Sequence, residues 1–127
     1  LPMGDRKLPG IAARDIGRSA YGIFKAGGEH VGRKVGIAGE HLTGEEMART
    51  LSEALGEPVR YNAVPFEVYR SLGFDGADDL GNMFQFKHDF EDYFCSARPV
   101  EGTRALNPDL QTFKEWVSAH RDRISAG

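Results

Sequence analysis

The sequence has 127 residues, a hydrophobic share of 40% and a formal net charge of −3. This length favours one domain, residues 1–127, with a core of its own. The charge balance argues against nucleic acid as a partner, and no apolar run approaches the ~20 residues of a membrane span. Because the chain begins at Leu1 and its first residues are typical of a chain interior, we expect a piece of a longer protein.

The N-terminal elements are predicted as an extended segment and a helix. Residues 1–14 are expected to be extended, with a short strand at residues 11–13. Asp15 is a favourable N-cap for a helix that reaches about Ala26, where Gly27-Gly28 would end it. The face predicted to be buried consists of Ile16, Ala20, Ile23 and Phe24.

A strand–helix–strand unit is predicted next. Residues 34–39 form a short apolar strand, and Thr43 with Glu46 forms a capping box at the start of a helix. Residues 59–64 predict a second strand after Gly56 ends that helix. The buried stripe of the helix is Met47, Ala48, Leu51, Ala54 and Leu55. This order is that of a βαβ unit, so we expect an α/β fold.

The rest of the chain is predicted to be mainly helical. Pro65 fits the first position of a short helix, and a further helix spans about residues 77–88. Residues 96–111 are expected to be irregular, and Thr112 opens the last helix with a second capping box. The inner stripe of that helix is Phe113, Trp116, Val117, His120 and Ile124. The expected fold therefore has a few short strands and about five helices.

No glycine-rich loop of the dinucleotide-binding kind lies between a strand and a helix. Such a loop lets the backbone approach a pyrophosphate at a helix N-terminus. Gly36 and Gly39 flank a predicted strand, but Glu45 and Glu46 occupy the first turn of the helix that follows. Because those carboxylates repel a phosphate, we expect this chain alone to bind no nucleotide cofactor.

Tyr21 and Lys25 have the Tyr-x-x-x-Lys spacing of the catalytic pair of short-chain reductases. At about 100° per residue, both fall on the side opposite the predicted apolar face of their helix. We therefore predict that they face solvent or a partner, and assign no catalytic residue. The four histidines lack zinc-site spacing. Cys95 is interpreted as a small, partly buried side chain, with Arg98 as weak support for a reactive thiol.

An aromatic cluster extends from residue 84 to residue 94. Aromatic side chains line pockets for flat organic molecules, but they also form cores and interfaces, and both alternatives stay open. Phe86 and Tyr93 lie off the helical stripe of the other members and are the best placed to face something beyond the core. The candidate residues for a pocket or an inter-domain contact are Met83, Phe84, Phe86, Phe90 and Tyr93.

Several segments carry a resemblance in their order and spacing. They are Leu1-Pro2-Met3-Gly4-Asp5, Leu8-Pro9-Gly10-Ile11, Asp15-Ile16-Gly17, Val31 to Gly39 with Leu42-Thr43, Tyr69-x-x-Leu72-Gly73-Phe74, Asp79-Leu80-x-Asn82-Met83-Phe84, and Leu106-Asn107-Pro108 before Phe113-x-x-Trp116. Each motif alone is weak, but together they cover nearly all 127 residues. The chain resembles the part past the midpoint of NmrA-like proteins, and is most similar to the animal NmrA-like redox-sensor type.

The resemblance implies what the rest of such a protein contributes. Complete family members join an N-terminal Rossmann domain, which binds NADP(H), to a smaller C-terminal part. This chain would be that C-terminal, substrate-side part, with the missing Rossmann half as its partner, and a protein partner or a homodimer as further contacts. The implied location is the cytoplasm, with the nucleus as a second one. No cofactor or catalytic residue is carried over, because the family's phosphate-binding loop has no counterpart here.

Three functions compete on this basis, and the first is favoured because no catalytic tyrosine is placed. The first is a regulatory, non-catalytic module of an NADP(H)-sensing protein. The second is the substrate-specificity part of an NAD(P)H-dependent, quinone-type reductase, and the third is a stand-alone α/β binding module. Turnover of a quinone would separate the first two, and a ligand bound by the isolated chain would favour the third. We also expect the isolated chain to expose apolar surface.

Overall fold

The computed structural model describes residues 1–124 and shows a mixed α/β fold. Its strands are β1 (Leu8–Gly10) and β2 (Glu40–Leu42). Over the described range, seven α-helices follow in chain order: α1 (Ala13–Lys25), α2 (Gly44–Leu55), α3 (Phe66–Arg70), α4 (Ala77–Asp89), α5 (Glu91–Ser96), α6 (Val100–Leu106) and α7 (Phe113–His120). Two short 3-10 helices follow α1 and α7, at Gly27–His30 and Arg121–Arg123.

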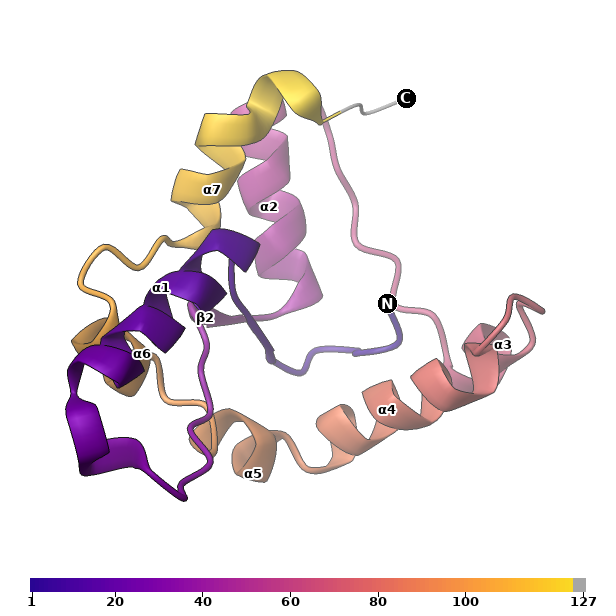
Figure 1. The fold of residues 1–127 in the computed structure, drawn as a ribbon. Coiled ribbons are helices and arrows are strands. Elements are labelled where there is room, and N and C mark those ends of the chain that lie inside the picture. Colours follow the sequence, from indigo (N-terminus) through magenta and orange to yellow (C-terminus); the bar gives the residue numbers. More distant parts are fainter. Residues whose placement is uncertain (125–127) are drawn as a thin grey trace.

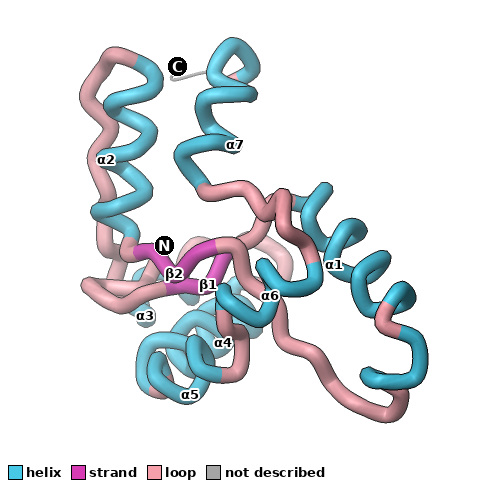
Figure 2. Tube along the Cα trace, turned by 90° about the vertical axis from the view of Figure 1, so that its left-hand side faces the viewer, coloured by secondary structure: helices cyan, strands magenta, loops and turns pink. Residues whose placement is uncertain are grey.

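The helices surround the two-stranded ribbon in three groups (Figures 1 and 2). Helices α2 and α7 pack together on one side of the ribbon, and α1 packs against α6 on another. Helices α3, α4 and α5 form the third group, in which α5 contacts β1. The ribbon therefore lies where the three groups meet.

The ribbon replaces the βαβ unit that the sequence predicted. Strand β1 pairs antiparallel with β2, so that Leu8 lies opposite Leu42 and Gly10 opposite Glu40. The strands predicted at residues 11–13 and 34–39 are wrong in position, because the ladder forms at β1 and β2 and Ala13 already begins α1.

The predicted strand at residues 59–64 is also wrong within the described chain. The segment has no ladder partner there. Its Val59 N–H instead donates to the hydroxyl of Ser52 at 2.8 Å. A β-like composition marks an extended segment, but a strand exists only where a second segment pairs with it.

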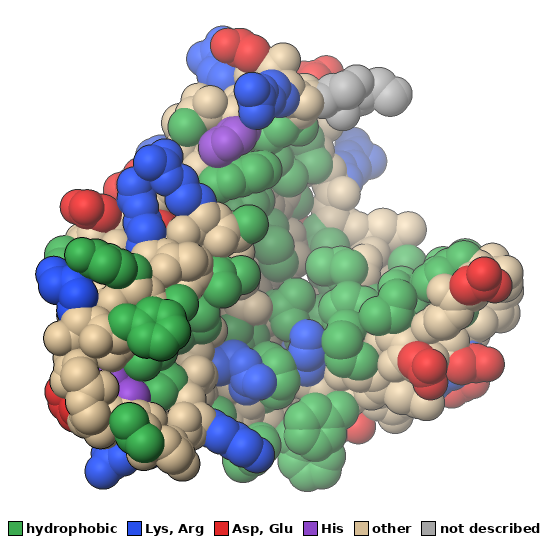
Figure 3. Space-filling model, in the orientation of Figure 1, with side chains coloured by type: hydrophobic (Ala, Val, Ile, Leu, Met, Phe, Trp, Pro, Cys, Tyr) green, Lys and Arg blue, Asp and Glu red, His purple; other side chains and the backbone are tan. Residues whose placement is uncertain are grey.

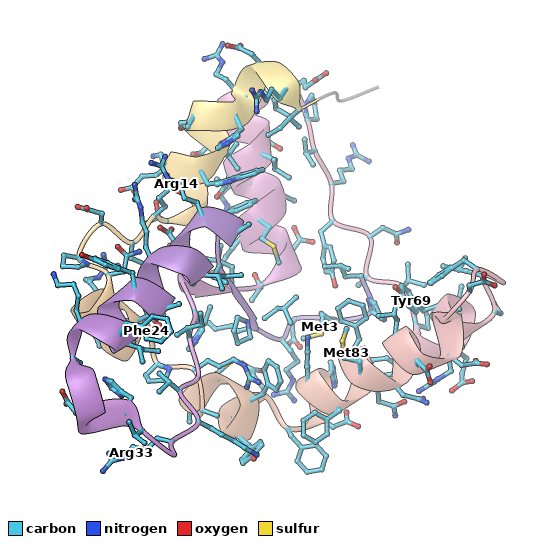
Figure 4. All side chains as sticks on the ribbon, in the orientation of Figure 1. Met3, Arg14, Phe24, Arg33, Tyr69 and Met83 are labelled. Carbon is cyan, nitrogen blue, oxygen red and sulfur yellow. The ribbon has the colours of Figure 1, made fainter. Side chains whose placement is uncertain are left out.

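Helix α1 buries a polar face, which corrects the predicted apolar one. Asp15 is not the N-cap, since that position belongs to Ala12, and the Asp15 side chain is fully buried. Ser19 is buried on the same face, whereas Ile16 and Ala20 are exposed and Phe24 is 82% exposed. Figure 4 shows Phe24 on α1, the helix that packs against α6.

Two contacts explain the orientation of α1. The carboxylate of Asp15 accepts hydrogen bonds from the Asn107 side-chain amide at 3.1 Å and from the Gln111 N–H at 3.0 Å. A side chain at Gly22 would collide with the Leu106 carbonyl of α6. Because only glycine permits this approach, α1 turns its Asp15 face inward and its apolar face outward.

The predicted starts and inner stripes of α2 and α7 are confirmed, except that Ile124, predicted in the stripe of the last helix, lies beyond the end of α7 at His120. Both helices begin with a complete capping box, Thr43 with Glu46 and Thr112 with Glu115. Gly56 ends α2 with a φ of 71°, a left-handed conformation that favours glycine. Ala48 on α2 and Val117 on α7 are buried in the predicted stripes.

Residues 96–111 are not wholly irregular, because α6 lies within them. Pro99 precedes the first turn of α6, where its missing N–H is no loss. Thr103 of α6 is fully buried, and its hydroxyl accepts a hydrogen bond from the Ala38 N–H at 3.0 Å. This contact ties α6 to the segment before β2, a tertiary effect that local composition does not show.

Candidate functional site

An apolar cavity lies between the ribbon, the start of α1 and the helix pair α2–α7. Its volume is about 350 Å³, within the range of pockets that hold small organic ligands. Figure 3 shows hydrophobic side chains along α2 and α7. The apolar side chains that line the cavity are Leu8, Ile11, Ala12, Ala13, Leu42, Met47, Phe113 and Trp116.

Trp116 gives the cavity a flat, fixed wall. Its ring stacks on the His120 ring with centroids 4.4 Å apart and an angle of 16° between the planes. His120 is held in turn by a 2.7 Å hydrogen bond between its Nδ1 and the Trp116 carbonyl. A preoriented indole loses little conformational freedom when a flat ring stacks on it.

The polar groups of the lining also hold the cavity in shape. Glu40 accepts a hydrogen bond from the Phe113 N–H at 2.7 Å, which joins β2 to the start of α7. The Gln111 N–H is bound by buried Asp15. Thr112 caps α7. The loop before α7 is thus fixed at both its ends, so the cavity is largely preformed.

The sequence prediction missed this cavity for a definite reason. The stripes that contain Met47 and Trp116 were both predicted to face inward, and they do. The space between these two stripes depends on the ribbon, and the sequence did not indicate that β1 pairs with β2. The available signal was the apolar segment from Leu8 to Ala13, which leads into α1.

The candidate residues of the aromatic cluster lie elsewhere, on α4, at Phe90 and on α5, and none lines this cavity. Phe84 is buried, with its ring centre 5.6 Å from that of Tyr69. In Figure 4, Met83 lies on α4, and its side chain is half-buried. These two residues belong to the packing of α4, and their role in a pocket or an inter-domain contact stays a prediction.

The other three candidates form an exposed aromatic patch, defined here as Phe86, Phe90 and Tyr93. All three are exposed, and Tyr93 is 68% exposed. The ring centres of Phe86 and Phe90 are 5.1 Å apart, and those of Phe86 and Tyr93 are 6.5 Å apart. Contiguous exposed aromatic surface of this kind marks contact sites. Phe86 and Tyr93 are exposed, but Phe90 is exposed as well, and the role of all three in a pocket or an inter-domain contact stays a prediction.

Tyr21 and Lys25 are exposed, as predicted, but not for the predicted reason, because the apolar face of α1 is exposed as well. Tyr21 is 66% exposed, and Lys25 Nζ lies 5.5 Å from the centre of its ring. Neither lines the cavity. Across residues 1–124, no three His, Cys, Asp or Glu side chains gather as metal ligands.

Cys95 lies in an environment that disfavours its thiolate. Burial, followed by the charge of Glu91, raises the pKa of the thiol, although Lys7 and Arg98 act in the opposite direction. A raised pKa lowers the reactivity of the thiol at neutral pH. The structure therefore supports the interpretation of Cys95 as an ordinary packed residue.

No helix in the described part of the chain has both the length and the apolar character needed to cross a membrane.

Comparison with known proteins shows a family and a similar protein. Residues 1–117 match the NmrA-like family. The chain is also 38% identical, over 133 aligned residues, to a protein of Xenophilus azovorans named NAD(P)H azoreductase. That alignment covers 99% of this chain but 45% of the relative, so the chain spans less than half the length of the protein it matches.

Proposed function

Because the chain belongs to the NmrA-like family, we propose that it is the substrate-side part of an NAD(P)H-dependent reductase. The proposal rests on the apolar cavity beside Trp116. It is supported by the similarity to a protein named NAD(P)H azoreductase. We propose that the cavity holds a flat aromatic acceptor, such as a quinone or an azo compound.

The chain's own residues would bind and orient this acceptor. The Trp116 ring offers a stacking surface, and Leu8, Leu42 and Met47 exclude water around it. The hydride would come from the nicotinamide of the cofactor. Apart from Glu40, which Phe113 already engages, the lining offers no carboxylate, imidazole or phenol for acid–base work. The role proposed for this chain is therefore positioning and selection of the acceptor.

The junction between β2 and α2 does not suit the pyrophosphate of a dinucleotide. At the start of α2, the Thr43 hydroxyl already accepts the Glu46 N–H at 3.1 Å, and Glu46 accepts the Thr43 N–H at 2.8 Å. Glu45 adds a second negative charge in the same turn, which disfavours a phosphate. We therefore propose that a separate N-terminal Rossmann half binds NADP(H) and that this chain does not.

Two exposed surfaces offer contacts for that half or for a second copy of the chain. One is the outer face of α1 with Ile16 and Phe24, and the other is the aromatic patch. Titration of this chain with NADPH, followed by the cofactor's fluorescence, is expected to show no saturable binding. Micromolar affinity would contradict the proposed division of roles between the two halves.

Turnover by the complete polypeptide tests the proposed activity. Oxidation of NADPH in the presence of 1,4-naphthoquinone is expected. Ala12→Leu, which places three more carbons in the cavity, should lower kcat/KM for the quinone about tenfold. Ala105→Leu makes the same change on the exposed surface of α6 and should leave kcat/KM unchanged. Turnover that Ala12→Leu and Ala105→Leu affect equally would count against the cavity.

A regulatory NADP(H)-sensing module, of the animal redox-sensor type, is the second candidate. The observation in its favour is the exposed position of Tyr21, which leaves the Tyr-x-x-x-Lys pair outside the cavity. The same assay separates the two candidates. NADPH binding by the complete polypeptide without turnover of any quinone or azo acceptor would favour regulation.

A further inference from the structure

Two basic side chains lie against one aromatic ring where α4 and α5 meet. The guanidinium carbon of Arg98 is 3.7 Å from the ring centre of Phe94. Lys87 Nζ is 5.0 Å from the same centre. The separation of the two charged groups therefore cannot exceed the sum of their distances from the ring centre. At such a separation two like charges repel each other. Within residues 1–124, neither side chain has a carboxylate at ion-pair distance.

Arg98 is held in place by several contacts. Its Nη1 donates a hydrogen bond to the Phe94 carbonyl at 3.1 Å, and its own carbonyl is hydrogen-bonded to His41 Nε2 at 2.8 Å. The aliphatic stem of Arg98 packs against Gly36. A Cβ atom added to Gly36 would lie 3.2 Å from the Cγ atom of Arg98. An arginine fixed in this way loses less rotamer freedom when it binds an anion.

The surrounding charges leave this place with a positive excess. Beside Cys95, Lys7 and Arg98 face the carboxylates of Glu91 and Asp92, and Glu91 is also engaged by Arg6 at 3.4 Å. Burial, followed by the charge of Arg98, lowers the pKa of Lys87. On the face drawn in Figure 3, basic side chains lie near the middle and most acidic ones lie toward the rim.

We propose that Lys87 and Arg98, ordered by the Phe94 ring, form a binding site for the oxyanion of a ligand, a phosphate or a carboxylate. A guanidinium and an ammonium group present several N–H donors to such oxygens. An anion close to both groups would relieve their mutual repulsion. The site shares no residue with the apolar cavity, so it goes beyond the proposed reductase function and can fail independently of it.

Two sources of the anion fit this chemistry. A phosphate would use the two cations alone. An aromatic carboxylate would also contact the neighbouring aromatic patch, because the ring centre of Phe86 is 6.4 Å from that of Phe94. Inorganic pyrophosphate and 2-naphthoate are the probes that separate these sources.

The experiment is a titration of the 127-residue chain with each probe, followed by amide chemical shifts in NMR and by calorimetry. Binding is expected to shift the amides around Lys87 and Arg98. Lys87→Gln and Arg98→Gln should each weaken it about tenfold, as expected for the loss of one charge-assisted contact. Lys114→Gln removes the same charge from an exposed position on α7 and should change nothing.

Each outcome decides the proposal. Tighter binding of pyrophosphate assigns the site to a phosphate, and tighter binding of naphthoate assigns it to an aromatic carboxylate. Arg98→Lys, which keeps the charge, should retain part of the affinity and shows that the loss in Arg98→Gln is not due to misfolding. No binding of either probe at millimolar concentration would overturn the proposal. Equal weakening by Lys87→Gln and Lys114→Gln would overturn it as well.

Discussion

Helices α1 and α2 have similar lengths and similar amphipathic sequences, yet they bury opposite kinds of side chain. Helix α2 turns its apolar stripe inward and forms one wall of the cavity. Helix α1 buries Asp15 and Ser19 and leaves Ile16 and Phe24 exposed. An apolar stripe therefore shows that a helix face contacts something, but not that the contact lies within the same chain.

The difference between the two helices comes from one carboxylate and one glycine. The Asp15 carboxylate accepts hydrogen bonds from the Asn107 side-chain amide and the Gln111 N–H, and so fixes the loop that leads into α7. Gly22 lets α1 approach the backbone of α6. Helix α2 follows the usual pattern of an amphipathic helix: a capping box starts it, and its hydrophobic stripe faces the interior. The predictions below test this comparison, from the largest expected effect to the smallest.

Removal of the buried carboxylate of α1 should have the largest effect. Asp15→Ala leaves the Asn107 amide and the Gln111 N–H without their acceptor in a buried place. The expected cost is ~3 kcal/mol in the free energy of unfolding, measured by urea denaturation. Glu45→Ala removes an acidic side chain from the first turn of α2, where it is exposed, and should cost less than ~1 kcal/mol. Equal losses would contradict a special role for Asp15.

Removal of the cap of α2 should have an intermediate effect. Thr43→Ala leaves the Glu46 N–H without its hydroxyl acceptor, which should destabilise the chain by ~1 kcal/mol. Thr43→Ser keeps the hydroxyl and serves as the matched control in the same denaturation series. A loss as large as that of Asp15→Ala would mean that the two helix starts contribute alike.

Removal of the outer apolar group of α1 should have the smallest effect. Phe24→Ser changes a side chain that is 82% exposed, so the free energy of unfolding should change by no more than ~0.5 kcal/mol. Leu51→Ser, in the inner stripe of α2, should destabilise far more. A large loss for Phe24→Ser would mean that Phe24 packs within the chain, and that the sequence prediction for α1 was correct.

The sequence predicted the parts of the fold that depend on local signals. The capping boxes at Thr43 and Thr112 and the stop at Gly56 lie within a few residues of the helices they delimit. The ribbon, α6 and the orientation of α1 depend on partners far along the chain, such as Leu42 for Leu8 and Asn107 for Asp15. The strand predicted at residues 59–64 failed for the same reason, because pairing is not a local property.

The candidate site divides in the same way. Trp116 and Met47 were both placed on inner stripes from the sequence. Their meeting around a cavity follows from the ribbon, which local patterns did not predict. The aromatic patch was found from the sequence because its members are close together in the chain. Its function stays a prediction, which the titration with 2-naphthoate addresses.

Binding of a flat acceptor beside Trp116 tests the central claim most directly, and Trp116 is the only tryptophan of the sequence. Titration of the 127-residue chain with 1,4-naphthoquinone should quench its fluorescence along a saturable curve. Ala12→Leu, inside the cavity, should weaken that binding about tenfold, whereas Ala105→Leu should not. Quenching that stays linear with concentration, or that both variants leave unchanged, would contradict a binding site in the cavity.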